Sequence, residues 1–265
     1  MISGIQFFSK GILMAKKKVR TPVDFSELGG YRYLHFGSEW IQGGMQINRP
    51  YRLALEYQQS MMALALFEPH PKEILQLGLG AAGFAKFTWK YLPEAKTTVV
   101  EISEDVYMAC RMWFKLPEED DHLKIVFEDC KKYLFEGNFE PVDWLLVDIY
   151  DAEAWGPVYD DVPFYRLCRK ALREGGVASF NLFGGEDFEK SYKAISEAFY
   201  GQVLIMPEVQ EGNRIVIASK GEKKDYSIEQ LKERAAEIQA RLKVPAKKWI
   251  KMLQKENSLS NEFKF

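Results

Sequence analysis

Residues 74–83 read ILQLGLGAAG and carry the pattern that decides the fold. An apolar run ends at Gly78, and Gly80 and Gly83 complete the spacing G-x-G-x-x-G ahead of a segment rich in aromatic residues. Glycines at these positions allow a tight turn and let a ligand approach the backbone without meeting a Cβ atom. The stretch predicts a strand, a turn and a helix that bind a nucleoside-bearing ligand. A joint of the same kind without any ligand also uses small residues, so that alternative stays open.

Short apolar strands alternate with helical segments over most of the chain. We predict strands at 73–78, 97–101, 123–127, 142–148, 177–182, 202–206 and 214–218, and helices at 84–91, 103–115, 163–173 and 187–199. This alternation is typical of a doubly wound, mostly parallel α/β sheet, here of about seven strands. Only the segment PEVQEGN separates the last two strands, so we expect them to form an antiparallel hairpin at one edge of the sheet.

The chain is expected to divide into four parts. Apolar residues recur at helical spacing between Leu53 and Phe67, and Ser227 and Gln230 form a capping-box pattern ahead of an amphipathic helix. A shorter helix through Trp249 is expected to follow. The predicted parts are a tail outside the fold (1–20), a small β segment with the start of a connecting helix (21–62), a nucleoside-binding Rossmann-like domain (63–221) and a C-terminal helical extension (222–265).

Composition excludes several classes of protein. The chain has 265 residues and a net charge of −2, which does not suggest a nucleic-acid-binding surface. No apolar run approaches the roughly eighteen residues of a membrane span. Three cysteines without a C-x-x-C pair and three scattered histidines indicate neither a disulfide framework nor a metal site. The basic cluster follows the apolar N-terminal stretch instead of preceding it, so no signal peptide is indicated and we expect a cytoplasmic location.

Four acidic residues fall where predicted strands end. Glu101 closes the second strand, Asp129 follows the third, and Asp148 and Asp151 follow the fourth. Ligands of open α/β sheets bind beyond the carboxyl ends of the strands. Glu101 follows the glycines by about twenty residues, the spacing at which an acid binds ribose hydroxyls. Any one of these acids could instead be a helix cap or a solvated surface residue.

The acid after the third strand distinguishes two kinds of ligand. A nicotinamide dinucleotide uses the glycine turn and the first acid but gives no reason for Asp129. An adenosyl-sulfonium ligand explains Asp129, because this acid can accept a hydrogen bond from the adenine amino group. Asp148 and Asp151 would then face the reacting end of the ligand. Together with the edge hairpin, this placement favours the S-adenosylmethionine-dependent methyltransferase-like fold.

Several segments resemble the spermidine synthase family, the polyamine aminopropyltransferases. They are GGMQ (43–46), GLGAAG (78–83), VVEIS (99–103), FEDCKKYL (127–134), LLVDIYDAEAWGP (145–157) and LREGGVASFN (172–181). The resemblance implies a small N-terminal β domain, and transfer of the aminopropyl group of decarboxylated S-adenosylmethionine to a diamine such as putrescine. It also implies an oligomer, for which we expect a homodimer.

The resemblance also assigns roles to individual residues. Asp148 resembles the proposed base of the family's D-S-S-D-P signature, and Asp151, with Tyr150 and Trp155 nearby, is expected to orient the amine. Glu101 resembles the ribose acid, Asp129 the adenine-side acid and Gln46 a glutamine that contacts the nucleoside. The full set of expected cofactor contacts is Gln46, Gly78, Gly80, Ala81, Gly83, Glu101, Ile102, Asp129 and Cys130.

The chain departs from the family pattern at positions near the reacting atoms. Ala81 stands where the family has a glycine-loop aspartate that holds the aminopropyl amine, and Ile149 and Tyr150 replace two serines. The family's D-E-x-x-Y segment is not recognisable, and either Tyr51 or Tyr57 could take the place of its tyrosine.

These departures keep two alternatives open. Intact S-adenosylmethionine carries a carboxylate, and Ala81 would leave N–H groups at the helix start free to bind that anion. The second candidate function is therefore methyl transfer to a small molecule, with Asp148 holding the methionine amine or the acceptor. The third is a catalytically inactive protein that binds an adenosyl ligand.

Overall fold

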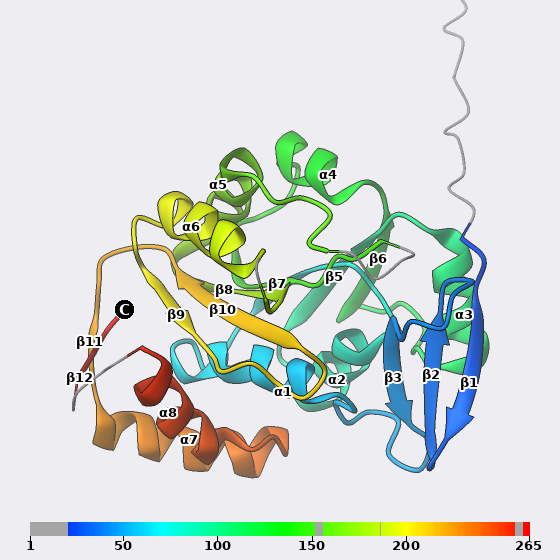
Figure 1. Ribbon diagram of the computed structural model, residues 1–265, viewed down its shortest axis with the longest axis horizontal. Helices are drawn as coiled ribbons and strands as arrows, with labels where there is room; N and C mark the ends of the chain where they lie inside the picture. The colour runs from blue at the N-terminus through cyan, green and yellow to red at the C-terminus, as the bar shows by residue number, and fades with distance from the viewer. Residues whose placement is uncertain (1–20, 152–155, 186, 258–261) are drawn as a thin grey trace, which may run out of the picture.

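A seven-stranded sheet forms the centre of the computed structural model, which describes residues 21–151, 156–185, 187–257 and 262–265 (Figure 1). The strand order is β6-β5-β4-β7-β8-β10-β9, parallel from β6 to β8 and antiparallel at β10 and β9. The strands are β4 (Glu73–Leu77), β5 (Lys96–Glu101), β6 (Leu123–Phe127), β7 (Val142–Val147), β8 (Leu172–Phe183), β9 (Val203–Ile205) and β10 (Asn213–Ser219). The predicted doubly wound sheet and its antiparallel edge hairpin are confirmed.

Helices cover both faces of this sheet because side chains alternate along each strand (Figure 1). Leu145 and Val147 of β7 belong to the core cluster on one face of the sheet, whereas Trp144 and Leu146 belong to the cluster on the other face. One face carries α4 (Cys130–Glu136), α5 (Val162–Ala171) and α6 (Phe188–Ala198). The other carries α1 (Glu56–Met61), the 3₁₀ helix η1 (Met62–Leu66), α2 (Gly83–Tyr91), α7 (Ile228–Leu242) and α8 (Ala246–Glu256). The remaining helix, α3 (Glu104–Trp113), packs beside α2.

Side-chain caps begin four of these helices. Ser103 accepts from the backbone N–H of Val106, and Ser227 forms the predicted capping box with Gln230. Asp129 and Asp161 cap α4 and α5 in the same way. Helix α4 was not predicted, since its seven residues are too few to show a clear helical period.

The N-terminal segment forms a three-stranded antiparallel sheet of β1 (Asp24–Leu28), β2 (Tyr31–His35) and β3 (Gly43–Gln46), which lies beside α3 (Figure 1). The expected helix from Leu53 is shorter than predicted. Regular helix begins at Glu56 and tightens into η1 after Met61. Residues 1–20, the expected tail, lie outside the described part of the chain.

Two further features of the structure differ from the predictions. Strand β8 starts at Leu172 instead of Val177, because Leu172 already pairs with Val142. A register shift follows this pair, and the glycines at 175–176 interrupt the apolar pattern there, so the sequence did not predict the first part of the strand. The C-terminal extension contains the two expected helices and also a two-stranded sheet of β11 (Asp225–Ser227) and β12 (Glu262–Lys264). Strands of three residues are too short to carry an alternating pattern.

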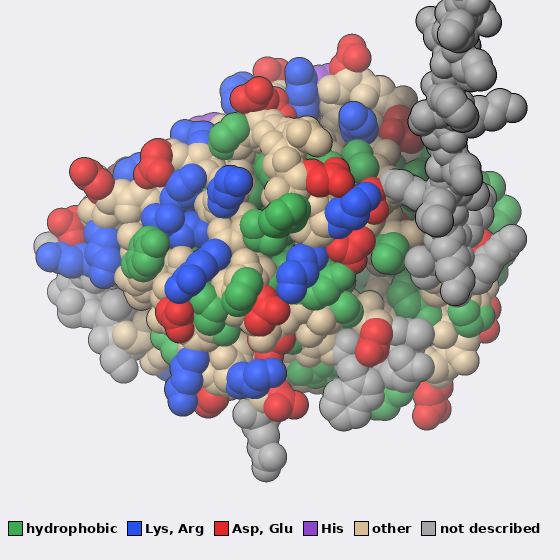
Figure 2. All heavy atoms as spheres, turned by 90° about the horizontal axis from the view of Figure 1, so that it is seen from above, with side chains coloured by type: hydrophobic (Ala, Val, Ile, Leu, Met, Phe, Trp, Pro, Cys, Tyr) green, Lys and Arg blue, Asp and Glu red, His purple; other side chains and the backbone are tan. Residues whose placement is uncertain are grey.

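The outer face of α4, α5 and α6 carries both signs of charge, as Figure 2 shows. Ion pairs such as Arg166–Glu197 and Lys190–Asp160 join neighbouring elements there. None of the described helices is both long and apolar enough to span a bilayer.

A buried lysine joins α2 to α3. Lys86 is 1% exposed, and its Nζ donates a 2.8 Å hydrogen bond to the carbonyl of Phe114, the residue that ends α3. A cation at this position interacts favourably with the negative end of the helix. Burial nevertheless lowers the pKa of Lys86 to about 8. The folded protein therefore releases a proton near pH 8 that the unfolded chain keeps until about pH 10.

The buried lysine predicts a rise in stability with pH. Between pH 8 and 9.5 the unfolded chain binds more protons than the native state, so the free energy of unfolding should increase by about 1 kcal/mol per pH unit. Urea denaturation of the wild type should show this slope, and Lys86→Met should abolish it. Lys90→Met, an exposed lysine on the same helix, is the control and should keep it. Equal slopes in the wild type and Lys86→Met would contradict the assignment.

Candidate functional site

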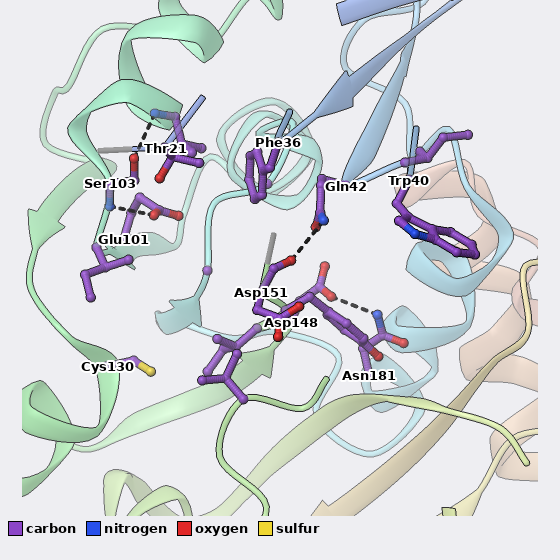
Figure 3. A pocket seen from close by; sticks show the side chains of 18 of the residues that line it. Thr21, Phe36, Trp40, Gln42, Glu101, Ser103, Cys130, Asp148, Asp151 and Asn181 are labelled. Atoms are coloured by element: carbon purple, nitrogen blue, oxygen red, sulfur yellow. Dashed lines mark hydrogen bonds between the residues drawn. The ribbon is translucent and has the colours of Figure 1, made fainter. Parts of the chain in front are cut away.

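A cleft of about 720 Å³ lies at the carboxyl ends of the parallel strands (Figure 3). The loop between β2 and β3 closes it from the opposite side with Phe36, Trp40 and Gln42. This volume falls in the range of small-molecule sites, and the position is the one expected for a ligand of an open α/β sheet.

Two glycines of the predicted turn line the cleft. Gly78 has a φ of +89°, and a Cβ atom there would lie 2.2 Å from the carbonyl oxygen of Asp148. Gly80 has a φ of +52°, and its Cβ would lie 3.2 Å from the carbonyl oxygen of Gln42. The first glycine thus lets the end of β4 pass against the end of β7, and the second makes room for the loop above.

The other two residues expected at the turn do not reach the cleft. Ala81 is buried against Gly43, whose Cβ would lie 2.8 Å from the Ala81 nitrogen. Gly83 is covered by Gln58, whose Nε2 would lie 2.5 Å from a Cβ at that position. The start of α2 is therefore packed against protein, and neither Ala81 nor Gly83 lines the cleft in which the sequence placed them.

Glu101 is held at the base of the cleft by two backbone groups. Its Oε2 accepts from the N–H of Leu79 at 2.9 Å. Its Oε1 accepts from the N–H of Ser103 at 2.8 Å, which Figure 3 shows. Burial raises the pKa of Glu101, and these hydrogen bonds act in the opposite direction. A carboxylate has about four acceptor sites, so Glu101 keeps acceptor capacity for a ligand beside the half-exposed Ile102.

Asp129 serves as a helix cap and as a wall of the cleft at the same time. Its Oδ1 accepts from the N–H of Lys132 at 2.8 Å, and its Oδ2 accepts from the hydroxyl of Tyr159. Cys130 follows in the same wall, where burial raises the pKa of its thiol to about 12. A thiol with so high a pKa is not a nucleophile near neutral pH.

Asp148 lies at the centre of a small hydrogen-bond network. Its Oδ1 accepts from Asn181 Nδ2 at 2.8 Å, which Figure 3 shows, and its Oδ2 accepts from the hydroxyl of Tyr57 at 3.1 Å. Burial raises the pKa of Asp148, and both hydrogen bonds oppose that rise. Of the two candidate tyrosines, Tyr57 lines the cleft whereas Tyr51 stacks on Trp89.

Tyr150 and Asp151 continue the wall after Asp148. The ring of Tyr150 packs against Gly156 and meets Phe183 edge-on with 5.4 Å between centroids. Burial, and then the charge of Asp148, raise the pKa of Tyr150. Asp151 is exposed, and its carbonyl accepts from Gln42 Nε2 at 2.9 Å (Figure 3). Trp155, expected near the amine, lies outside the described residues.

Gln42 lies on the cleft wall, and Gln46 does not. Gln46 ends β3, pairs with Tyr31 and lines a separate hollow of about 170 Å³ with Arg49. A glutamine stands on each side of the segment Gly43-Gly44-Met45, and only the path of the β2–β3 loop determines which one faces a ligand. The structure therefore places Gln42 on the wall of the cleft and Gln46, the predicted nucleoside contact, in the separate hollow.

Three residues at the far side of the cleft were not predicted. Asn181 lies near the end of β8, Glu211 belongs to the connection between β9 and β10, and Asn213 begins β10. The position of Asn181 near a strand end was the only available signal. Glu211 and Asn213 reach the site because β10 runs antiparallel to β8 and brings its first residues to the same edge.

The cleft has a strongly one-sided charge. Seven carboxylates line it, and the described residues of its wall include no lysine, arginine or histidine: Glu39, Glu101, Glu128, Asp129, Asp148, Asp151 and Glu211. A cleft lined by one sign of charge concentrates ligands of the other sign. The described residues contain no group of His, Cys, Asp and Glu side chains arranged to hold a metal ion. The acidic lining therefore favours cationic ligands.

Comparison with known proteins points to one family. A sequence model described as the spermine/spermidine synthase domain matches residues 54–222. A polyamine aminopropyltransferase of Chromobacterium violaceum is 34% identical over 238 residues, covering 89% of this chain and 90% of the relative. Another, from Neisseria meningitidis serogroup A, is 34% identical over 220 residues, 82% of each chain.

Solved structures share the fold at lower identity. A probable spermidine synthase from Corynebacterium glutamicum aligns with a TM-score of 0.67 at 20% identity, covering 86% of this chain and 88% of its own. Human methyltransferase-like protein 13 in complex with SAH aligns with a TM-score of 0.64 at 20% identity, covering 72% of this chain and 93% of its own. A spermidine synthase in complex with the transition state analogue AdoDATO aligns with a TM-score of 0.54 at 22% identity, covering 76% of this chain and 74% of its own. These similarities confirm the predicted methyltransferase-like fold.

The contact between Gly78 and Asp148 predicts that adding a single methyl group at Gly78 strongly lowers the free energy of unfolding. Gly78→Ala combines a left-handed backbone with a clash against a carbonyl oxygen, whereas Gly29→Ala, at φ +61° with no atom within 4 Å, carries only the backbone cost. Urea denaturation should show a loss of about 1 kcal/mol for Gly29→Ala and at least about 2 kcal/mol more for Gly78→Ala. Equal losses would show that the two strand ends do not approach as described.

Proposed function

The chain belongs to the spermine/spermidine synthase family and is a transferase, and from this premise we propose that it moves the aminopropyl group of decarboxylated S-adenosylmethionine to a polyamine such as putrescine. The observation that carries the proposal is the cleft with seven carboxylates and no described basic side chain. Decarboxylated S-adenosylmethionine carries a sulfonium and an ammonium but no carboxylate, and the acceptor is also a cation. Both reactants therefore match the charge of the cleft.

The nucleoside is proposed to lie along the wall formed by the ends of β4, β5 and β6. Glu101 would bind the ribose hydroxyls through its remaining acceptor sites, close to Gly78 and Gly80. Asp129 would accept from the adenine amino group, with Ile102 and Cys130 against the base. On this arrangement the sulfonium points toward Asp148 and Asp151, across the cleft from Glu101.

The proposed reaction is a direct displacement at carbon. The neutral nitrogen of the acceptor attacks the methylene carbon bonded to sulfur, the new C–N bond forms, and the C–S bond breaks with its electron pair staying on sulfur. The products are the extended polyamine and the thioether methylthioadenosine, and the proton lost from nitrogen passes to a base. Holding the two reactants in line within a closed cleft supplies much of the rate.

Asp148 is the proposed base. Amines of this kind have a pKa near 10 and arrive protonated, so the site must bind the cation and then remove a proton. Burial makes Asp148 a stronger base, while Asn181 and Tyr57 hold it in its ionised form and in one orientation. Tyr150 and Asp151 would flank the amine, since an aromatic face and a second carboxylate both attract ammonium.

Methyl transfer from intact S-adenosylmethionine fits the cleft less well. Its carboxylate would need a cation or free backbone N–H groups, and the described wall has no cation. Gly43 and Gln58 cover the helix start around Ala81 and Gly83. The network around Asp148 likewise argues against an inactive binding protein, because a buried carboxylate is costly to keep without a use.

The role of Asp148 predicts a selective loss of turnover. Asp148→Asn keeps the shape and one hydrogen-bond acceptor but cannot take a proton, so turnover should fall by about 10²–10⁴-fold. Affinity for methylthioadenosine should change by no more than about twofold, because Asp148 faces the reacting end and not the nucleoside. Turnover by product mass spectrometry and binding by calorimetry check the two parts. Wild-type turnover in the variant would remove Asp148 from the mechanism.

The role of Glu101 predicts loss of ribose recognition. The wild type should bind methylthioadenosine about tenfold or more tightly than its 2′,3′-dideoxy analogue, because two charge-assisted hydrogen bonds are lost with the hydroxyls. Glu101→Gln should weaken binding of the parent nucleoside and bind the two compounds with similar affinity in calorimetry. The ratio separates ribose contact from any general damage to the fold. An unchanged ratio would show that Glu101 only supports the backbone.

A further inference from the structure

Glu211 is a carboxylate of the cleft to which the proposed mechanism gives no role. It belongs to the connection between β9 and β10, far along the chain from the other acids, and it lines the cleft. Its side chain is exposed.

A direct chain of contacts links Glu211 to the proposed base. Glu211 Oε1 accepts from the backbone N–H of Glu56 at 2.8 Å. The next residue, Tyr57, donates its hydroxyl proton to Asp148 Oδ2 at 3.1 Å. The two carboxylates are thus fixed at opposite ends of one tyrosine, Glu211 near its main chain and Asp148 at its hydroxyl group. All three residues line the cleft.

Apolar groups line the same cleft as the two carboxylates. They include Leu55, the ring of Tyr57 and Phe183. A cleft that combines two carboxylates with apolar groups complements a molecule with two ammonium groups joined by methylenes. The length of a tyrosine side chain corresponds to about four to six methylene groups.

We propose that Glu211 binds the distal ammonium of the acceptor while Asp148 engages the attacking nitrogen, so that Glu211 selects α,ω-diamines over monoamines. The inference rests on the proposed function and names the residue that sets its acceptor specificity. The distal ammonium does not change charge during the reaction, so its contact contributes equally to the ground state and to the transition state. Removing the contact should raise KM for the diamine and leave kcat nearly unchanged.

The test compares 1,4-diaminobutane with butylamine, which has the same chain and one nitrogen fewer. Wild-type kcat/KM should be at least about tenfold higher for the diamine. Glu211→Gln, which keeps an acceptor for the N–H of Glu56, should raise KM for 1,4-diaminobutane about tenfold and leave butylamine unchanged. Calorimetry of 1,4-diaminobutane in the presence of methylthioadenosine should show the same loss of affinity without turnover.

A matched control lies in the same connection. Glu208→Gln removes the same charge from an exposed residue that does not line the cleft, and should leave both acceptors unaffected. A series of diamines with three to six methylenes adds a second readout. The wild type should prefer one length, and that preference should flatten in Glu211→Gln.

The possible outcomes distinguish failure of the role of Glu211 from failure of the proposed aminopropyl transfer. Equal losses for the diamine and the monoamine in Glu211→Gln would show that Glu211 only supports α1, and no loss for either would show that it does not contact the acceptor. Both results would overturn the inference and leave aminopropyl transfer intact. Failure of the wild type to transfer an aminopropyl group to any amine would instead overturn the proposed function, and the acceptor role of Glu211 with it.

Discussion

The close approach of two strand ends is the constraint on which the site depends. Gly78 directly follows β4 and lies against the carbonyl oxygen of Asp148, which directly follows β7, with no room for a Cβ atom between them. This contact brings the glycine turn and the proposed base to the same edge of the sheet. Tyr57 and Asn181 then hold the carboxylate from the helix and from the neighbouring strand. A site assembled from four separate elements thereby becomes a single packed unit.

The many carboxylates of the cleft pose an energetic problem that the fold solves locally. Buried acids are costly unless hydrogen bonds compensate them. Backbone N–H groups hold Glu101, a helix start holds Asp129, and side chains hold Asp148. All three acids line the cleft, so their negative potential is available to a ligand. A cationic pair of reactants would neutralise that potential, which ties the stability of the site to its proposed substrates.

Predictions from the sequence succeeded where a local rule applied. Strand periodicity located the seven strands, and strand ends located Glu101, Asp129, Asp148 and Asp151, all of which line one cleft. They failed where two equivalent residues competed or where a contact spans distant segments. Gln42 faces the cleft in place of Gln46 because of the course of one loop. Ala81 and Gly83 are covered by residues from the β3 region and from α1, which no glycine spacing reveals.

The sequence by itself determined the fold class, the position of the glycine turn and the acids along one edge, because alternation of side chains and left-handed glycines are local properties of the chain. Only the tertiary structure decided that Tyr57 rather than Tyr51 reaches Asp148, and that Asn181 and Glu211 share its cleft. Those residues come from α1, β8 and the connection before β10, and their meeting depends on sheet order and strand direction. Neither sheet order nor strand direction can be deduced from the spacing of residues along the chain.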